Sequence, residues 1–385
     1  MAPTRIQSTD DGASDSAPVR YIPTEVLAPG ETLRETLDAL DMSQAQLAQR
    51  TGMSTKHVNQ ILRGHAALTH DTAILLERTT GVAAKFWNNL EAQYRDHLAR
   101  EHERQSLASQ HEWLKRMPLA ALRKLRLITA TARDPGAQLQ QVFQFFGVSS
   151  IDSWQQVWAE PAAAFLQSAA FDADAGAVAA WLRLGELEAA RIDCQPFDRT
   201  GLRELLPTLR SLTVLEPQRF WPELRRLCAS VGVAVVVVAE VPGARASGAT
   251  RWISPNKAIV QLSNRGRRND KFWFAFFHEI GHVLLHGKRE VFVENKIGYD
   301  GGRIRQEAEA NDFAGNLLIP LEFLPALGRV RSARDVRELA ERLEISPAII
   351  AGRIQRDRDD YRFGLNQDLF DKFEIVRRSD SRESD

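Results

Sequence analysis

The segment HEIGHVLLH, residues 278–286, constrains the fold of this chain more than any other, because its chemistry needs a helix. Side chains four residues apart project from the same face of a helix, so His278 and His282 can bind one metal ion. Glu279 stands between them, where its carboxylate can activate a water at that ion. The upstream run 270–277 is apolar and lacks Pro and Gly, which favours a buried helix leading into the motif. The pattern predicts a zinc (Zn²⁺) site for peptide-bond hydrolysis.

A third metal ligand is expected downstream, because a catalytic zinc ion takes three protein ligands and keeps one open position. The segment 306–320 has helical apolar spacing that ends at Pro320, and it contains Glu307 and Glu309. Glu309 lies next to the apolar stripe, where a carboxylate is costly unless it is paired or bound to metal. We therefore predict Glu309 as the third ligand, in preference to the more peripheral Glu307.

His286 is a rival for the third position, since it lies a further turn along the motif helix. Eight residues after His278, it stands about 80° off the face that carries that ring. We expect it beside a ligand rather than on the metal. With zinc in place, Glu279 would take a proton from water and pass it to the leaving amine. Candidates for steadying the oxyanion are Tyr299, Arg303 and Arg305, and that role stays open.

The two segments HEIGHVLLH and EAEANDFAGNLLIP together resemble the ImmA/IrrE family of bacterial and phage metallopeptidases, over roughly residues 230–325. The resemblance implies that His278, His282 and Glu309 bind zinc and that Glu279 is the general base. It also implies a substrate class, because the family cleaves helix-turn-helix repressors, often in response to stress.

Runs rich in β-branched residues precede the motif, at residues 232–241, 250–254 and 257–263. They predict a small sheet. Its edge could hold a substrate peptide in extended form, since backbone pairing tolerates many sequences. The sheet could equally serve only to support the motif helix, and both interpretations stay open.

A second motif lies near the N-terminus, in residues 43–70. Ser43 and Gln46 form a capping-box pattern that opens a short helix, which Gly52 ends. Ser54 opens a second helix with an apolar inner face. Two short helices around a Gly-containing turn predict a helix-turn-helix, whose second helix enters the major groove of DNA. The block resembles the Xre or HigA-like class of regulators.

The outer face of the second helix is polar, which suits contact with bases and phosphates. Asn59 and Gln60 could read adenine edges, while Lys56 and Arg63 could meet guanine or phosphate. The predicted DNA-binding residues are Ser54, Thr55, Lys56, Asn59, Gln60 and Arg63. Residues 42–70 contain no acidic side chain, so the region is modestly basic. Because so few positive charges give one copy only a weak affinity for DNA, we expect a homodimer on paired half-sites of operator DNA.

The chain has 385 residues with 50 basic and 50 acidic side chains, so its overall charge predicts neither nucleic-acid binding nor membrane binding. Its apolar runs fall short of the about 18 residues that a membrane span needs. Cys194 and Cys228 are the only cysteines, which fits a reducing compartment. Residues 1–20 lack the apolar stretch of a signal peptide and are typical of a disordered tail. We expect a cytoplasmic protein without membrane contact.

Helical spacing dominates the rest of the chain. We predict a mainly α fold with a small β-sheet (α+β class), made of an N-terminal helix-turn-helix bundle, a helical middle region and a C-terminal zincin-like metallopeptidase domain. The predicted segments are a disordered tail (1–22), a helix-turn-helix DNA-binding domain (23–100), a helical linker or sensor region (101–225), an ImmA/IrrE-like zinc peptidase domain (226–325) and a C-terminal helical cap with a tail (326–385).

Two functions fit these predictions. In the first, a DNA-binding transcriptional regulator carries a zinc endopeptidase that cuts a repressor or antitoxin in a stress, phage or toxin-antitoxin response. In the second, the chain is a HigA-like repressor or antitoxin whose peptidase fold is a sensor or partner-binding module with little or no turnover. The intact Glu279 favours the first.

Overall fold

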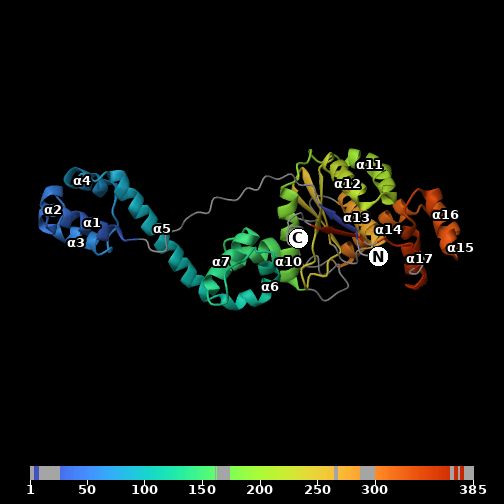
Figure 1. Ribbon diagram of the computed structural model, residues 1–385, viewed down its shortest axis with the longest axis horizontal. Helices are drawn as coiled ribbons and strands as arrows, with labels where there is room; N and C mark the ends of the chain where they lie inside the picture. Colours follow the sequence, from blue (N-terminus) through green and yellow to red (C-terminus); the bar gives the residue numbers. More distant parts are fainter. Residues whose placement is uncertain are drawn as a thin grey trace. The chain divides into compact units, whose positions relative to one another are not determined.

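The computed structural model describes residues 4–7, 27–160, 162, 174–263, 268–286, 300–364, 368–371 and 373–376. The chain divides into two compact units (Figure 1). Residues 12–112 with 130–141 form one, which we call the N-terminal unit. Residues 1–11, 113–129 and 142–385 form the other, which we call the sheet unit.

Five helices of the N-terminal unit enclose one apolar core. They are α1 (Pro29–Ala39), α2 (Gln44–Thr51), α3 (Thr55–Leu62), α4 (His70–Thr80) and α5 (Ala84–Ala108). Each helix contributes at least one side chain that is at most 1% exposed: Leu33, Leu47, Val58, Leu76 and Trp87. Short helices such as α2 and α3 are marginal alone, so this shared core is what stabilises them.

Local signals set the boundaries of α2 and α3. The Ser43 hydroxyl accepts a hydrogen bond from the Gln46 backbone N–H at 3.2 Å, and the Gln46 side chain accepts one from the Ser43 N–H at 2.8 Å. The predicted capping box is therefore confirmed. Gly52 ends α2 with a φ of 75°, a conformation that glycine adopts without strain. Ser54 then caps α3 by accepting from the His57 N–H at 3.2 Å.

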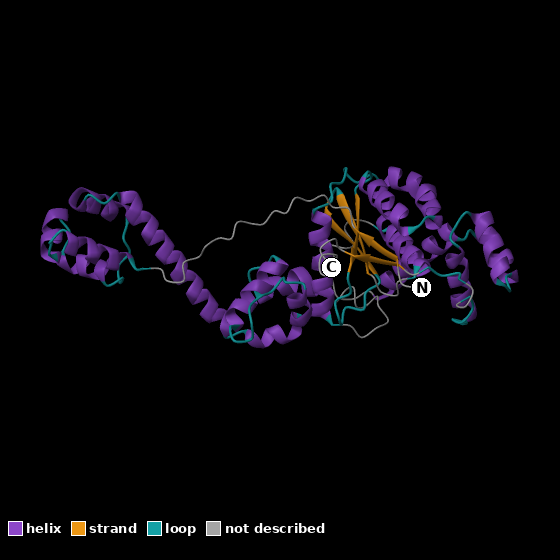
Figure 2. Ribbon diagram, in the orientation of Figure 1, coloured by secondary structure: helices purple, strands orange, loops and turns teal. Residues whose placement is uncertain are grey.

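The sheet unit contains a mixed sheet of three strands (Figure 2). The strands are β2 (Val233–Val238), β3 (Gly248–Ser254) and β4 (Lys257–Ser263), in the order β2-β4-β3. β2 runs parallel to β4, with Val235 opposite Val260, whereas β3 runs antiparallel, with Thr250 opposite Val260. β-Branched side chains suit a pleated, buried surface, which is why these runs form strands. The order leaves β3 at one edge.

Helices cover both faces of this sheet (Figure 2). They are α12 (Pro217–Ala229) and α13 (Asn269–Leu285) on one face and α10 (Ala175–Ala190) on the other. On the first face, Val235 and Val260 belong to the apolar core shared with α12 and α13. On the second face, the Gln261 side-chain amide donates to the Trp181 carbonyl of α10 at 2.7 Å. A continuous run of valines such as β2 is typical of a strand buried on both sides.

Helix α10 falls within the segment predicted as a linker or sensor region, 101–225, yet it forms one layer of the sheet unit. Gly185 of α10 lies directly against the Gln261 side chain. Arg251 of β3 pairs with Glu186 of α10 at 2.9 Å. Helix α10 is therefore structurally part of the sheet unit.

The remaining helices between the two motifs are short. They are η1 (His111–Arg116), α6 (Leu119–Lys124), α7 (Pro135–Phe146), α8 (Ile151–Trp154), η2 (Gln155–Ala159), α11 (Arg199–Ser211) and η3 (Leu212–Val214). Aromatic rings join several of them: the centroids of Trp113 and Trp154 lie 5.0 Å apart, and those of Phe146 and Trp158 lie 5.6 Å apart. Large rings in such contacts supply much of the apolar burial here, so these tryptophans belong to the core.

Residues 300–358 are mostly helical as well. Their elements are α14 (Asp300–Leu318), η4 (Leu321–Phe323), α15 (Leu324–Arg329), α16 (Ala333–Leu343) and α17 (Pro347–Arg358). Val336, Leu339 and Ile350 join the core beneath the sheet, so α16 and α17 pack onto the sheet unit.

Two further strands, β1 (Thr4–Gln7) and β5 (Phe373–Val376), pair in parallel with Ile6 opposite Ile375. β1 falls in the predicted tail, and the other residues of that segment lie outside the described residues. The architecture confirms the predicted class, mainly α with a small sheet. Among the described residues, no helix combines the length and apolar character that crossing a bilayer requires.

Replacing Gly185 with Ala tests whether α10 is a layer of the sheet unit. A Cβ there would overlap the amide of Gln261, which is 1% exposed and has no room to move into solvent. We expect the free energy of unfolding to fall by about 1–3 kcal/mol, the usual effect of overpacking a core. Urea denaturation measures it. Gly328→Ala in α15, where an added Cβ meets nothing within 4 Å, is the control. Equal midpoints for the two variants would contradict the packing of α10.

Candidate metal centre and nucleic-acid interface

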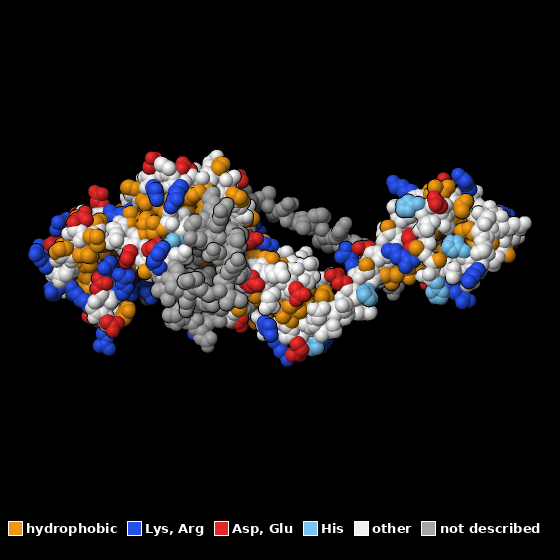
Figure 3. Space-filling model, turned by 180° about the vertical axis from the view of Figure 1, so that it is seen from behind, with side chains coloured by type: hydrophobic (Ala, Val, Ile, Leu, Met, Phe, Trp, Pro, Cys, Tyr) orange, Lys and Arg blue, Asp and Glu red, His pale blue; other side chains and the backbone are white. Residues whose placement is uncertain are grey.

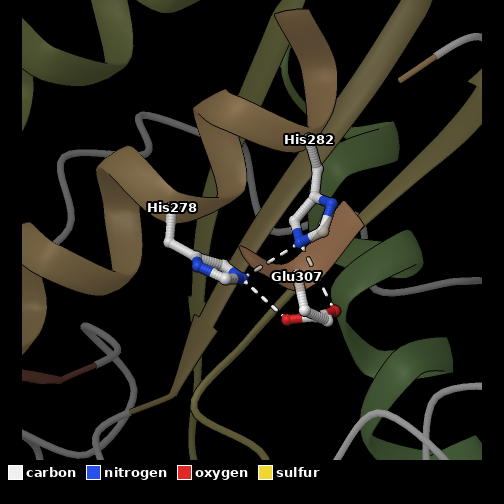
Figure 4. Close-up of side chains that lie close together, drawn as sticks. All are labelled: His278, His282 and Glu307. Atoms are coloured by element: carbon white, nitrogen blue, oxygen red, sulfur yellow. Dashed lines mark hydrogen bonds and ion pairs between the residues drawn. The ribbon is translucent and has the colours of Figure 1, made fainter. Parts of the chain in front are cut away.

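Helix α13 carries a core face and a histidine face. Trp273, Phe277 and Ile280 are at most 1% exposed and belong to the core beneath the sheet. His278 and His282 lie on the side that faces α14 (Figure 4). Their ring centroids are 4.7 Å apart, as the spacing of one helical turn predicts.

Helices α13 and α14 approach closely at Gly281. A Cβ on Gly281 would lie 3.1 Å from the Phe313 ring and 3.3 Å from the Ala310 Cα, so a side chain here would push α14 away. Ala310 is fully buried at this contact. Glu307 precedes Ala310 by about one turn, and the close approach brings its carboxylate up to the histidines. The glycine between the two histidines is thus a packing residue on which the site depends.

Three side chains converge between the two helices (Figure 4). Glu307 Oε2 lies 3.2 Å from His278 Nε2, and Glu307 Oε1 lies 3.5 Å from His282 Nε2. The two Nε2 atoms are 3.0 Å apart. The cluster offers two imidazole nitrogens and one carboxylate oxygen within 4.8 Å of one another.

This donor set fits a zinc ion. Zinc binds histidine nitrogen and carboxylate oxygen at about 2.0–2.2 Å in a tetrahedral arrangement, so its donors stand about 3.3 Å apart. The spacings between the Glu307 oxygens and the two Nε2 atoms are of that size. Two histidines and one carboxylate also leave a fourth position open, as catalytic sites do and structural sites do not.

Burial and neighbouring charge set the protonation of these groups. Burial, with the charge of His278, lowers the pKa of His282 to about 4, so this imidazole is neutral at physiological pH and keeps a lone pair for a metal. Burial acts the same way on His278, but its bond to Glu307 and the charge of Glu279 outweigh burial, so its pKa is raised. Burial raises the pKa of Glu307, but the bond to His278 and the charge of His282 outweigh it and hold the pKa below its ordinary value.

Glu279 reaches the edge strand rather than the cluster. Its side chain is 7% exposed, and the Thr250 hydroxyl donates to its Oε2 at 2.8 Å and to its backbone oxygen at 3.0 Å. Gly248 lies against the same carboxylate, so an added Cβ there would clash with it. Burial raises the pKa of Glu279 to about 7, against the opposing effects of His278 and the Thr250 bond. Such a carboxyl is suited to proton transfer near neutral pH.

Glu309, which the sequence predicts as the third ligand, does not join the two histidines of the cluster. It lies 3.3 Å from His286 Nε2 and 3.1 Å from Arg305 Nε, and its side chain is 44% exposed. Two helical steps turn the chain by about 200°, so Glu307 and Glu309 leave α14 in different directions. Glu307 lies against His278 and His282.

The reason for this difference is the rotation of α14. The sequence argument ranks Glu307 and Glu309 only by how close each lies to the apolar stripe. The contact at Gly281 instead determines which side of α14 meets α13. That contact selects the series 307, 310 and 314 (i, i+3, i+7), of which Ala310 and Ala314 are fully buried.

Two positions around the cluster carry contacts that the sequence did not indicate. The Thr250 contact to Glu279 joins residues 29 apart, so it left no local signal. Asn311 Oδ1 lies 3.0 Å from His278 Nδ1; its spacing of four from Glu307 could have placed it on the same face. Of the oxyanion candidates, Tyr299 and the side chain of Arg303 lie outside the described residues, and Arg305 pairs with Glu309.

Helix α3 of the N-terminal unit is amphipathic. Val58, Ile61 and Leu62 form its inner face and are at most 3% exposed. The predicted DNA-binding residues divide into the exposed Ser54, Thr55, Lys56 and Arg63 and the half-buried Asn59 and Gln60. An exposed polar helix on a compact bundle is what entry into the major groove requires.

The outer surfaces of α2 and α3 are linked. The Asn59 side chain donates to Gln44 Oε1 at 3.2 Å, so Gln44, the first residue of α2, extends the polar surface beyond the predicted residues. Figure 3 shows Lys, Arg and His side chains on one face of this unit. Basic side chains on the helix-turn-helix can attract the phosphate backbone of nucleic acid.

Comparison with known protein families divides the chain in the same way. A family model described as IrrE N-terminal-like domain, a peptidase family, matches residues 233–355. A helix-turn-helix family model matches residues 33–87. The peptidase match begins at β2 and includes α15 to α17, so it extends beyond the predicted boundary at residue 325 and leaves α10 outside.

The relatives found match the N-terminal unit. Virulence-associated protein I of Dichelobacter nodosus is 36% identical over 80 residues, which cover 20% of this chain and 73% of that protein. An uncharacterised HTH-type transcriptional regulator of Escherichia coli is 33% identical over 63 residues, 16% of this chain and 67% of that protein. The solved antitoxin HigA of Pseudomonas aeruginosa with the higBA promoter is 36% identical and covers 20% of this chain and 87% of that one, with a TM-score of 0.20. By these matches the chain belongs to the helix-turn-helix regulators through residues 33–87, and its residues 233–355 match the IrrE-like peptidase model.

Proposed function

We propose that this chain is a DNA-binding regulator whose IrrE-like domain is a zinc-dependent endopeptidase. The observation that carries the proposal is the convergence of His278, His282 and Glu307, with the buried Glu279 on the same helix as the two histidines. In this proposal the two Nε2 atoms and a carboxylate oxygen of Glu307 hold the ion, and Glu307 takes the place that the sequence gives to Glu309.

The chemistry follows from the surroundings of each group. When bound, zinc is a Lewis acid that polarises the scissile carbonyl and makes water a nucleophile near neutral pH. Glu279, with its pKa raised to about 7, takes a proton from that water and can release it to the leaving amine. Thr250 and Gly248 hold the carboxyl in place. β3 is at the edge of its sheet, so it can pair with an extended substrate next to the base.

The substrate class that we propose is a helix-turn-helix repressor or antitoxin, a second copy of this chain included. A peptidase tethered to operator DNA meets other proteins bound there at a high effective concentration. Cleavage would then relieve repression in a stress, phage or toxin-antitoxin response. The alternative function, a HigA-like repressor whose peptidase fold senses or binds a partner without turnover, predicts the same DNA binding and no cleavage.

The N-terminal unit would bind operator DNA through α3. Lys56 and Arg63 are exposed and can meet phosphate or guanine, while Asn59, held by Gln44, can read a base edge. One copy offers few charges, so we propose that a homodimer binds paired half-sites.

Changing Glu307 to Gln tests the third ligand. We expect the zinc dissociation constant to rise by about 100-fold or more, beyond the about 10- to 100-fold effect of residues that only support a ligand. Competition with a chromophoric chelator measures it. Asp312→Asn, which removes an exposed carboxylate from the same helix, should bind zinc like the unaltered chain. Equal affinities for the Glu307 and Asp312 variants would exclude Glu307 as a ligand.

Changing Glu279 to Gln tests catalysis. The variant should keep one equivalent of zinc and cleave about 10²- to 10⁴-fold more slowly, because the general base is lost. Both proteins are incubated with the chain itself and with the proteins encoded beside its gene, and mass spectrometry detects new fragments. Glu322→Gln, a change at an exposed glutamate, should cleave normally. Zinc in every variant with fragments from none would favour the non-catalytic alternative.

Changing Lys56 to Ala tests the role of α3 in DNA binding. Affinity for a fragment from upstream of the gene should fall by about tenfold, and the slope of log affinity against log salt should flatten by about 1. Filter binding across a salt series gives both quantities. Lys85→Ala removes the same charge from an exposed position on α5. The same loss in both variants would show that general charge, rather than α3, governs binding.

A further inference from the structure

His286 contacts His282 on the side of the ring opposite His278 and Glu307. It follows the last residue of α13 with an extended backbone, φ −101° and ψ 142°, and its N–H still donates to the His282 carbonyl at 3.1 Å. Because the helix ends there, the His286 ring can turn back toward His282, and the Nδ1 atoms of the two rings lie 2.9 Å apart. The His286 side chain is only 9% exposed. It is therefore held against the outer nitrogen of His282.

Glu309 completes a chain of contacts behind His286. Its Oε2 lies 3.3 Å from His286 Nε2, and its Oε1 forms an ion pair with Arg305 Nε at 3.1 Å. The carboxylate that turns away from the metal cluster is thus aimed at the partner of one of the cluster histidines. Glu307 and Glu309 lie two residues apart on α14, so their carboxylates take different positions. That of Glu307 lies against His278 and His282, and that of Glu309 lies against His286.

The proton positions in this chain follow from its geometry. To bind a metal, His282 must present the lone pair of Nε2, so its proton sits on Nδ1. Among the described residues, the acceptor within reach of that Nδ1–H is His286 Nδ1, which must then be unprotonated. The proton of His286 therefore sits on Nε2 and points at the Glu309 carboxylate. The ring N–H of His282 and the ring N–H of His286 then each have one acceptor.

We propose that His286 and Glu309 are positioning residues that hold His282 in the tautomer with a free Nε2 and fix its ring toward Glu307. This role rests on the proposed zinc site. His278 obtains the same support from a different source, since its Nδ1 lies 3.0 Å from Asn311 Oδ1. Groups that orient a metal-binding histidine in this way typically raise metal affinity by about 10- to 100-fold without touching the ion.

The test is zinc affinity in a set of variants of the full chain, measured by chelator competition. His286→Ala should weaken zinc binding by about 10- to 100-fold. His286→Asn, which can keep an acceptor near the position of Nδ1, should restore most of the loss. Glu309→Ala should weaken binding in the unaltered chain but not in the His286→Ala background, because the carboxylate acts through the ring. Equal losses from Glu309→Ala in both backgrounds would mean that it acts only by its charge, and would overturn the chain of contacts.

A spectroscopic measurement adds a signature that mere packing would not give. Nitrogen-15 NMR of the zinc-loaded chain should find His282 protonated on Nδ1 and His286 protonated on Nε2. His286 protonated on Nδ1 would overturn the proposal. Unchanged zinc affinity in His286→Ala, with Glu307→Gln still weakened, would overturn this role alone. Zinc binding by the unaltered chain that is no tighter than that of Glu307→Gln would overturn the metal centre, and this role with it.

Discussion

The convergence of His278, His282 and Glu307 depends on how closely α13 and α14 approach at Gly281. A site that binds one metal ion tolerates errors of only about 0.5 Å in the placement of its donors. One side of α13 is fixed by large side chains such as Trp273 and Phe277, which anchor it beneath the sheet. The absence of a side chain at Gly281 sets the distance to α14. The residue between the histidines that carries no chemistry is therefore the one that makes the geometry possible.

The environment separates the roles of two glutamates that lie near the same histidines. Glu307 is bonded to His278, and its pKa is held low despite burial, so it is a permanent anion suited to binding a cation. Glu279 is buried against β3 and its pKa is raised to about 7. Pairs of titratable groups whose surroundings push their pKa values apart commonly divide ligand, acid and base roles in this way. The sheet edge thus sets the chemistry of a residue that α13 supplies.

The features that the sequence predicts correctly are those with local signals. The capping box of Ser43 and Gln46, the turn at Gly52 and the i, i+4 histidines each involve residues at most four apart, and the runs of β-branched residues mark the strands. The choice between Glu307 and Glu309 needed the rotation of one helix against another, which no local pattern encodes. The same holds for α10, whose hydrogen bond to Gln261 joins residues 80 apart. Apolar spacing shows that such a helix is buried but not which surface it covers.

Strand β3 joins Glu279 to a part of the molecule that lies outside the residues matched by the peptidase family model. Thr250 and Arg251 are consecutive, so their side chains leave opposite faces of the strand. Thr250 binds Glu279, whereas Arg251 pairs with Glu186 of α10 and lies 5.2 Å from the centre of the Trp158 ring. One peptide unit is all that separates the two contacts. A displacement of α10 would therefore be transmitted through Arg251 and Thr250 to the Glu279 carboxyl, from the face of the sheet opposite α13.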